Sequence, residues 1–136
     1  MEQRVQNTLA TTMQEFCRKY IYFFEHYNEE EPRNDFQIFD DMTFPKECET
    51  LGFNMDCGYS FIKAFGEQVW LYPDGLEDIV KHSNNKKLIG SAIFSKWRFF
   101  NHWADCGPTE KDIEWFLIML RRLQELVTTQ RWLSEE

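Results

Sequence analysis

The chain has 136 residues, of which 43% are hydrophobic and 17% aromatic, and its formal net charge at pH 7 is −8. This apolar content excludes disorder of the whole chain, the low Gly and Pro content excludes a collagen-like fibre, and no apolar run approaches the roughly 18 residues of a membrane span. Because Met1 to Arg4 open no secretory signal peptide, we expect one cytoplasmic globular domain over residues 1–136 that does not contact a membrane.

The first predicted element is a long helix over residues 4–28. No Gly or Pro interrupts this stretch, and apolar residues recur at three- and four-residue steps: Val5, Leu9, Met13, Phe16, Cys17, Tyr20, Phe23, Phe24 and Tyr27. Pro32 disfavours helical geometry in the residue before it, so the helix should end near residues 29–31.

Residues 30–56 are predicted to form an irregular acidic segment. Acidic residues, Pro45 and Gly52 separate its short apolar groups. Polar and apolar residues alternate at 36–39, a pattern compatible with one short strand. A short helix is expected near 45–50.

The middle of the chain predicts short elements joined by turns. Residues 57–66 indicate a short helix that Gly66 ends, and the run at 69–72 is too short to classify. Residues 73–75 form a Pro-Asp-Gly turn, and a further short helix should follow over 76–82.

Two longer helices complete the expected fold. Residues 87–105 are apolar over more than half of the helix circumference, which indicates a central helix packed on several sides. Thr109 and Asp112 resemble a capping box at the start of a helix over 109–130. The predicted architecture is therefore mainly α, a compact multi-helix single domain of about four to six helices.

Aromatic residues are unusually frequent, with 13 Phe, five Tyr and five Trp. Four of them fall off the predicted apolar stripes: Tyr22, Phe94, Trp115 and Trp132. They either form an exposed patch that marks an interface or pack against neighbouring helices.

The negative charge is concentrated in one quarter of the chain. Residues 25–56 carry ten acids and two bases, and the remainder of the chain is balanced. Such a surface repels phosphate backbones, which argues against direct nucleic-acid binding, and it attracts a basic protein. The candidate partner-binding residues are Glu29, Glu30, Glu31, Asp35, Asp40 and Asp41. The alternative is a solvated loop whose charge serves solubility.

A narrow polar strip follows the central helix. Its residues recur at three- and four-residue steps or lie directly beside that line: Ser91, Ser95, Arg98, Asn101 and His102. If the strip faces a cleft, Arg98 could hold an anion and the serines could donate hydrogen bonds to it. Alternatively, the strip is a solvent edge, or Arg98 pairs with a carboxylate of residues 35–56.

Metal and catalytic patterns are weak. His102 and Cys106 have the spacing of two ligands on one helical face, which Cys48 and Cys57 could complete, but no zinc-ribbon spacing is present. We expect free thiols, no metal and no cofactor. Ser95 and His102 are separated by roughly 10.5 Å of helical rise, too far for a nucleophile and its base.

The chain therefore predicts a small interaction protein that binds and inhibits a basic protein partner through residues 25–56. In size and charge it resembles toxin-immunity proteins and phage-encoded inhibitors of bacterial defence, a likeness of style and not of sequence. The first alternative is a domain that binds a small molecule or a nucleotide-like anion at the polar strip. The second is a small enzyme with His102 as its acid or base, which the missing catalytic motifs disfavour.

Overall fold

The structure, a computed structural model, describes residues 9–26, 43–56, 58–103 and 109–134, without the side chains of 99–103 and 130–134. The described residues form seven helices and contain no strand: α2 (Met13–Glu25), α4 (Thr43–Thr50), α5 (Tyr59–Phe65), α6 (Gln68–Leu71), α7 (Leu76–Val80), α8 (Lys86–Trp103) and α9 (Glu110–Ser134). The prediction of a mainly α, compact single domain is confirmed. The described residues form seven helices and not about four to six, because the run at 69–72, which was too short to classify, lies largely in the short helix α6. The strand expected at 36–39 lies outside the described residues.

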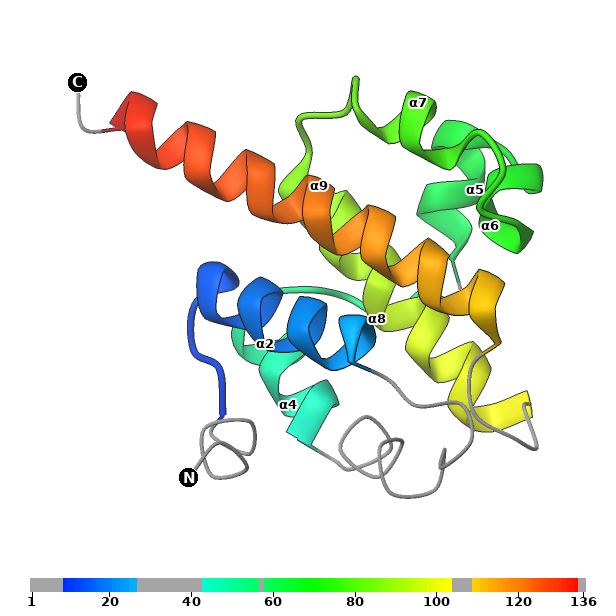
Figure 1. Cartoon of the computed structure of the whole chain (residues 1–136), viewed down its shortest axis with the longest axis horizontal. Coiled ribbons are helices and arrows are strands. Elements are labelled where there is room, and N and C mark those ends of the chain that lie inside the picture. The colour runs from blue at the N-terminus through cyan, green and yellow to red at the C-terminus, as the bar shows by residue number, and fades with distance from the viewer. Residues whose placement is uncertain (1–8, 27–42, 57, 104–108, 135–136) are drawn as a thin grey trace.

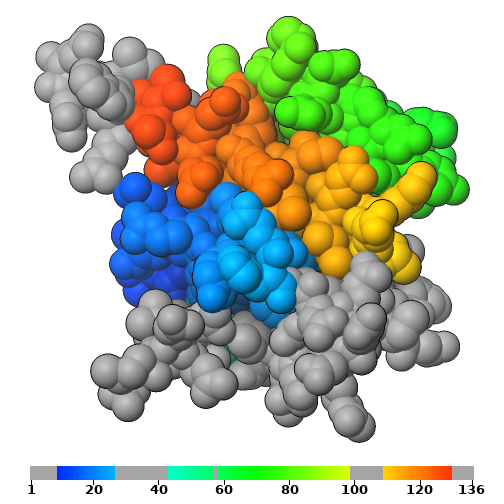
Figure 2. Space-filling view, viewed as in Figure 1, coloured from blue at the N-terminus to red at the C-terminus, as the bar shows by residue number. Residues whose placement is uncertain are grey.

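Helix α9 organises the molecule. It crosses the whole fold and packs against α2, α8 and α7 (Figure 1). Figure 2 shows the surface of α9 (orange) lying between α2 (blue) and the short helices α5 to α7 (green). Helix α8 lies behind α9 in the same view and also carries α4 and α5.

The core is built largely from aromatic rings. Phe16 and Tyr20 of α2 lie 5.6 and 5.0 Å from the ring of Phe44 on α4, measured between ring centroids. Phe24 of α2 stacks on Phe116 of α9 at 4.8 Å with nearly parallel planes. Such ring pairs add to the free energy of area burial, and here each pair joins two helices.

One of the four off-stripe aromatics, Trp115, is fully buried, and so is Met119 on the same side of α9. Of the two alternatives for the off-stripe aromatics, Trp115 follows the second: it packs against Phe61 and Trp70 of neighbouring helices, because α9 has neighbours on several sides. Phe94 is also buried, whereas Tyr22 is 40% exposed. The side chain of Trp132 lies outside the description.

Helix α8 is buried along its middle, as the sequence predicts for a central helix. Every residue from 89 to 97 is buried. A Cβ atom on Gly90 would come within 2.1 Å of the Phe53 ring, so only glycine lets the segment after α4 approach α8 this closely.

The bounds of two predicted helices differ in part from expectation. Helix α2 begins at Met13, because Thr12 and Glu15 form a capping box, and the described residues 9–12 are not helical, contrary to the prediction. Residues 4–8 and 27–28 of the predicted helix lie outside the described residues. Helix α9 begins as predicted, where the Asp112 amide donates to Thr109 Oγ1 at 3.3 Å, but it continues to Ser134. Within the described residues, no helix combines the length and hydropathy that a membrane crossing requires.

Candidate functional site

The six predicted partner-binding acids all lie between α2 and α4. Residues 27–42, which include all of them, are outside the described residues. The structure does describe the two helices on either side of them, α2 and α4.

A buried carboxylate joins α2 to α4. Glu47 of α4 has no exposed surface, and its side chain accepts hydrogen bonds from Lys19 Nζ at 2.7 Å and from the Tyr20 hydroxyl. It also accepts from the Ala10 amide at 2.7 Å, which fixes the chain just before α2. A buried carboxylate with three donors, one of them cationic, holds the helices on both sides of residues 27–42 in one arrangement. The sequence analysis counted Glu47 only as one of the ten acids in residues 25–56 and did not predict its buried contacts.

The two serines of the polar strip hold a neighbouring chain segment. Ser91 Oγ accepts from the Asn54 amide at 2.8 Å, and Ser95 Oγ accepts from the Asp56 amide at 3.1 Å. Both serines are buried. Their hydroxyls therefore satisfy the main chain of residues 53–56, which runs along α8 beside Gly90.

Asp56 continues this network to the start of α5. Its carboxylate accepts from the Gly58 and Ser60 amides and from the Ser95 hydroxyl, all at 3.1 to 3.2 Å. Partial burial raises the pKa of Asp56, but the hydrogen bonds from Ser60, Ser95 and Gly58 outweigh it and hold the pKa below its ordinary value. This carboxylate is a helix cap, which the sequence reading missed.

The remaining strip residues follow towards the end of α8. Arg98 is exposed. Asn101 and His102 lie within the helix, but their side chains are outside the description. The structure therefore separates the strip into two buried serines with structural partners and an exposed Arg98, and the roles proposed for His102 stay predictions.

Lys96, which the sequence analysis did not single out, is buried among aromatic rings. Its Nζ lies 4.8 Å from the ring centroids of both Trp70 and Trp115 and donates to the Trp70 carbonyl oxygen. Trp115 Nε1 donates to the adjacent Val69 carbonyl at 2.8 Å. Side chains of α8 and α9 thus bind two carbonyls of the four-residue helix α6, those of Val69 and Trp70.

The environment of Lys96 changes the pKa of its ammonium group. Burial lowers the pKa of Lys96 from 10.5 to about 8, although the carboxylate of Asp112 opposes this change. Cation–π contacts with two indole rings partly replace the lost hydration of the ammonium group.

The described cysteines, Cys17 and Cys48, are buried free thiols. Burial raises the pKa of Cys17 to about 12 and that of Cys48 well above its ordinary value. Such thiols stay protonated and are poor ligands and nucleophiles. In the part of the chain that the structure describes, no three His, Cys, Asp or Glu side chains gather as a metal site. Cys57 and Cys106 lie outside that part.

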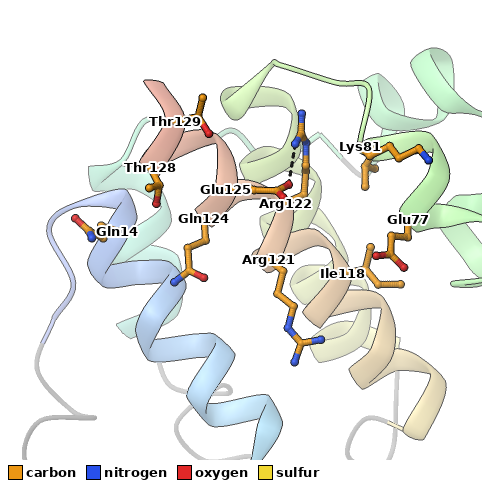
Figure 3. A pocket seen from close by; sticks show the side chains of 11 residues that line it. Gln14, Glu77, Lys81, Ile118, Arg121, Arg122, Gln124, Glu125, Thr128 and Thr129 are labelled. Atoms are coloured by element: carbon orange, nitrogen blue, oxygen red, sulfur yellow. Dashed lines mark hydrogen bonds and ion pairs between the residues drawn. The ribbon is translucent and has the colours of Figure 1, made fainter. Parts of the chain in front are cut away.

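A groove of about 710 Å³ lies over α9, with α2 on one side and α7 on the other. Figure 3 shows Gln14 reaching it from α2, Glu77 from α7 and Lys81 from directly after α7, and Arg121 and Arg122 from α9. Further along α9, the groove is lined by Gln124, Glu125, Thr128 and Thr129. Its lining combines three cations, two carboxylates and several neutral polar groups with the apolar side chains of Val80 and Ile118. No signal in the sequence indicated it.

Comparisons with known proteins give no family for this chain: no family model, no curated protein and no solved structure matches it.

Proposed function

We propose that this protein binds a basic protein partner through the acidic residues of its segment 25–56, and that it inhibits the partner by covering the bound surface. The observation that supports this proposal is the uneven distribution of charged residues along the chain. Residues 27–42 contain six acids and a single base, whereas the described side chains comprise 13 acids and 12 bases. The excess of negative charge thus belongs mainly to one short stretch, which is where a cationic partner would be attracted.

The contacts of α2 and α4 support the same proposal. Lys19 and Tyr20 near the middle of α2 bind Glu47 of α4, and aromatic rings of the two helices pack beside them. The last residue of α2 and the first residue of α4 therefore have fixed positions. A binding segment whose two ends are fixed has fewer conformations to lose when a partner binds than one with a free end.

The first experiment identifies the partner. The protein is purified gently from its own host and examined by native mass spectrometry at low and then at high salt. A bound basic protein that dissociates as salt rises is the expected result, because salt screens attraction between exposed charges. A small added mass that stays with the chain would instead favour the alternative of a ligand-binding domain.

The second experiment locates the binding surface with matched variants. Glu29, Glu30 and Glu31 are changed to Lys in one variant, and the exposed Glu67, Asp74 and Glu114 are changed to Lys in the control. Both variants have the same net charge, so they differ only in where the charge is reversed. We expect the first variant to lose the partner identified by mass spectrometry, and its inhibition, while the control keeps both. Equal binding by the two variants would contradict the proposal.

A further inference from the structure

Two stacked aromatic rings lie at the C-terminal end of α2. The ring of His26, the residue after the helix, lies 4.0 Å from the ring of Tyr22 between centroids, with 25° between the two planes. His26 Nδ1 donates to the Tyr22 carbonyl oxygen at 3.0 Å, which orients the imidazole ring. Tyr22 is nevertheless 40% exposed, and His26 is exposed as well. The pair therefore presents two oriented rings to solvent.

The charges that follow this pair along the chain favour a cation. The side chain of Glu25, three residues after Tyr22 on the same side of the helix, is 43% exposed although it pairs with Arg121. Residues 27–42, which come directly after His26, contain six acids and a single base. Arg18 is exposed one turn before Tyr22 and repels a cation, so a cation should approach the rings from the C-terminal end of α2.

Tyr22 differs from the other exposed tyrosines of the described chain in its position. Tyr59 of α5 already has a cation beside it, because Lys63 Nζ lies 6.0 Å from the centroid of its ring. Tyr72 follows α6, and Figure 2 shows the surface of α9 between α2 and the short helices α5 to α7. Tyr22 is therefore the exposed tyrosine that the sequence and the fold place next to the acidic stretch.

We propose that an arginine of the basic partner stacks on the Tyr22–His26 pair, while the acidic residues that follow α2 attract the partner's other cations. This inference rests on the proposed function and adds to it a contact outside the acidic residues. A guanidinium is planar and stacks on aromatic faces, whereas an ammonium is a compact, strongly hydrated charge, so the pair favours arginine over lysine. Because the two rings are oriented before binding, the contact costs little side-chain entropy.

Hexa-arginine and hexa-lysine peptides are the probes for this contact. The ¹⁵N-labelled protein is titrated with each peptide at low salt while amide shifts are recorded. We expect hexa-arginine to bind more tightly than hexa-lysine and to shift the amides of residues 22–26. Equal binding of the two peptides, binding of neither, or shifts that leave residues 22–26 unchanged would overturn the proposal.

Three variants separate stacking on the rings from general attraction of cations. Tyr22→Leu removes the ring but keeps an apolar side chain, and it should weaken hexa-arginine about two- to fivefold, as expected for an exposed cation–π contact. Tyr22→Phe keeps a ring and should bind like the wild type. Tyr72→Leu removes an equally exposed ring after α6 and should change nothing. Equal losses in Tyr22→Leu and Tyr72→Leu, or no loss in Tyr22→Leu, would overturn the arginine contact.

A fourth variant tests the premise separately. Changing Glu29, Glu30 and Glu31 together to Lys should abolish the binding of both peptides, because it reverses the attraction that brings them to the protein. If this variant loses both peptides while Tyr22→Leu binds like the wild type, the stacking contact is wrong and the acidic binding surface stands. If this variant keeps both peptides, the proposed function fails and the inference fails with it.

Discussion

Replacing Lys96 with Met should change how the stability of this protein depends on alkaline pH. Met keeps most of the aliphatic chain of Lys, so packing against Trp70 and Trp115 is largely retained while the buried ammonium group is removed. The Trp70 carbonyl loses its donor in this variant. That loss changes the absolute stability, but it does not depend on pH.

The size of the effect follows from the pKa of Lys96. In the folded protein this pKa is about 8, and in the unfolded chain it takes its ordinary value of 10.5. Between these values the unfolded chain binds more protons than the folded protein, so the free energy of unfolding rises with pH. At 1.36 kcal/mol for each pH unit, the titration of Lys96 raises the free energy of unfolding by about 3 kcal/mol as the pH rises from 7 to 10.5.

Urea unfolding followed by far-ultraviolet circular dichroism at pH 7, 8, 9 and 10 measures this contribution. The difference in unfolding free energy between the wild type and Lys96→Met should change steadily in favour of the wild type, since other groups titrate alike in both proteins. Lys111→Met, at an exposed position of α9, should follow the wild type throughout. If Lys96→Met also runs parallel to the wild type, the ammonium group is hydrated and the reasoning from burial fails.

Three further substitutions test the contacts that hold the fold, each by urea unfolding at neutral pH. Glu47→Gln should lower the free energy of unfolding by about 3 kcal/mol, because it leaves Lys19 without its carboxylate. The change Glu49→Gln, at an exposed position, should lower it little. Equal effects of the two changes would show that the contact between α2 and α4 is unimportant. Ser95→Ala should cost about 1–3 kcal/mol by removing the acceptor of the Asp56 amide, and a neutral result would mean that water replaces the hydroxyl. Gly90→Ala should destabilise by about 1–3 kcal/mol through overlap with the Phe53 ring, and a stabilised variant would show that this ring moves freely.

The sequence predicted most helices because their signals are local. These signals act within a few residues: the apolar spacing, the Thr109–Asp112 capping box, and the turn at 73–75 that precedes a helix. The structure has helices at the positions that they predict. The start of α2 carried a local signal too, the Thr12–Glu15 capping box, but the apolar spacing continues upstream of it. The periodic pattern therefore wrongly extended the helix over residues 9–12, where the capping box marks the start of α2.

The polar groups were harder to assign because their partners are distant in sequence. Ser91 and Ser95 follow one edge of a helix, yet what they bind is the main chain of residues 54–56. Lys96 gave no signal, since a lysine beside apolar residues on a helix usually extends its amine to water. Only the placement of α6 shows that its amine meets the Trp70 carbonyl instead. Contacts such as these depend on tertiary packing, which periodicity does not encode.

The acidic quarter of the chain contains carboxylates that hold the fold, and its composition alone does not separate them from the six that are proposed to bind a partner. Glu47 and Asp56, at its C-terminal end, hold α2 to α4 and cap α5, and Glu25 at its N-terminal end pairs with Arg121. These three carboxylates have partners within the fold, and reversing the charge of Glu47 or Asp56 would weaken the protein whatever it binds. The six acids between residues 27 and 42 are the ones on which a test of partner binding has to rest. A charge-reversal experiment that mixed the two groups would confuse a lost partner with a lost fold.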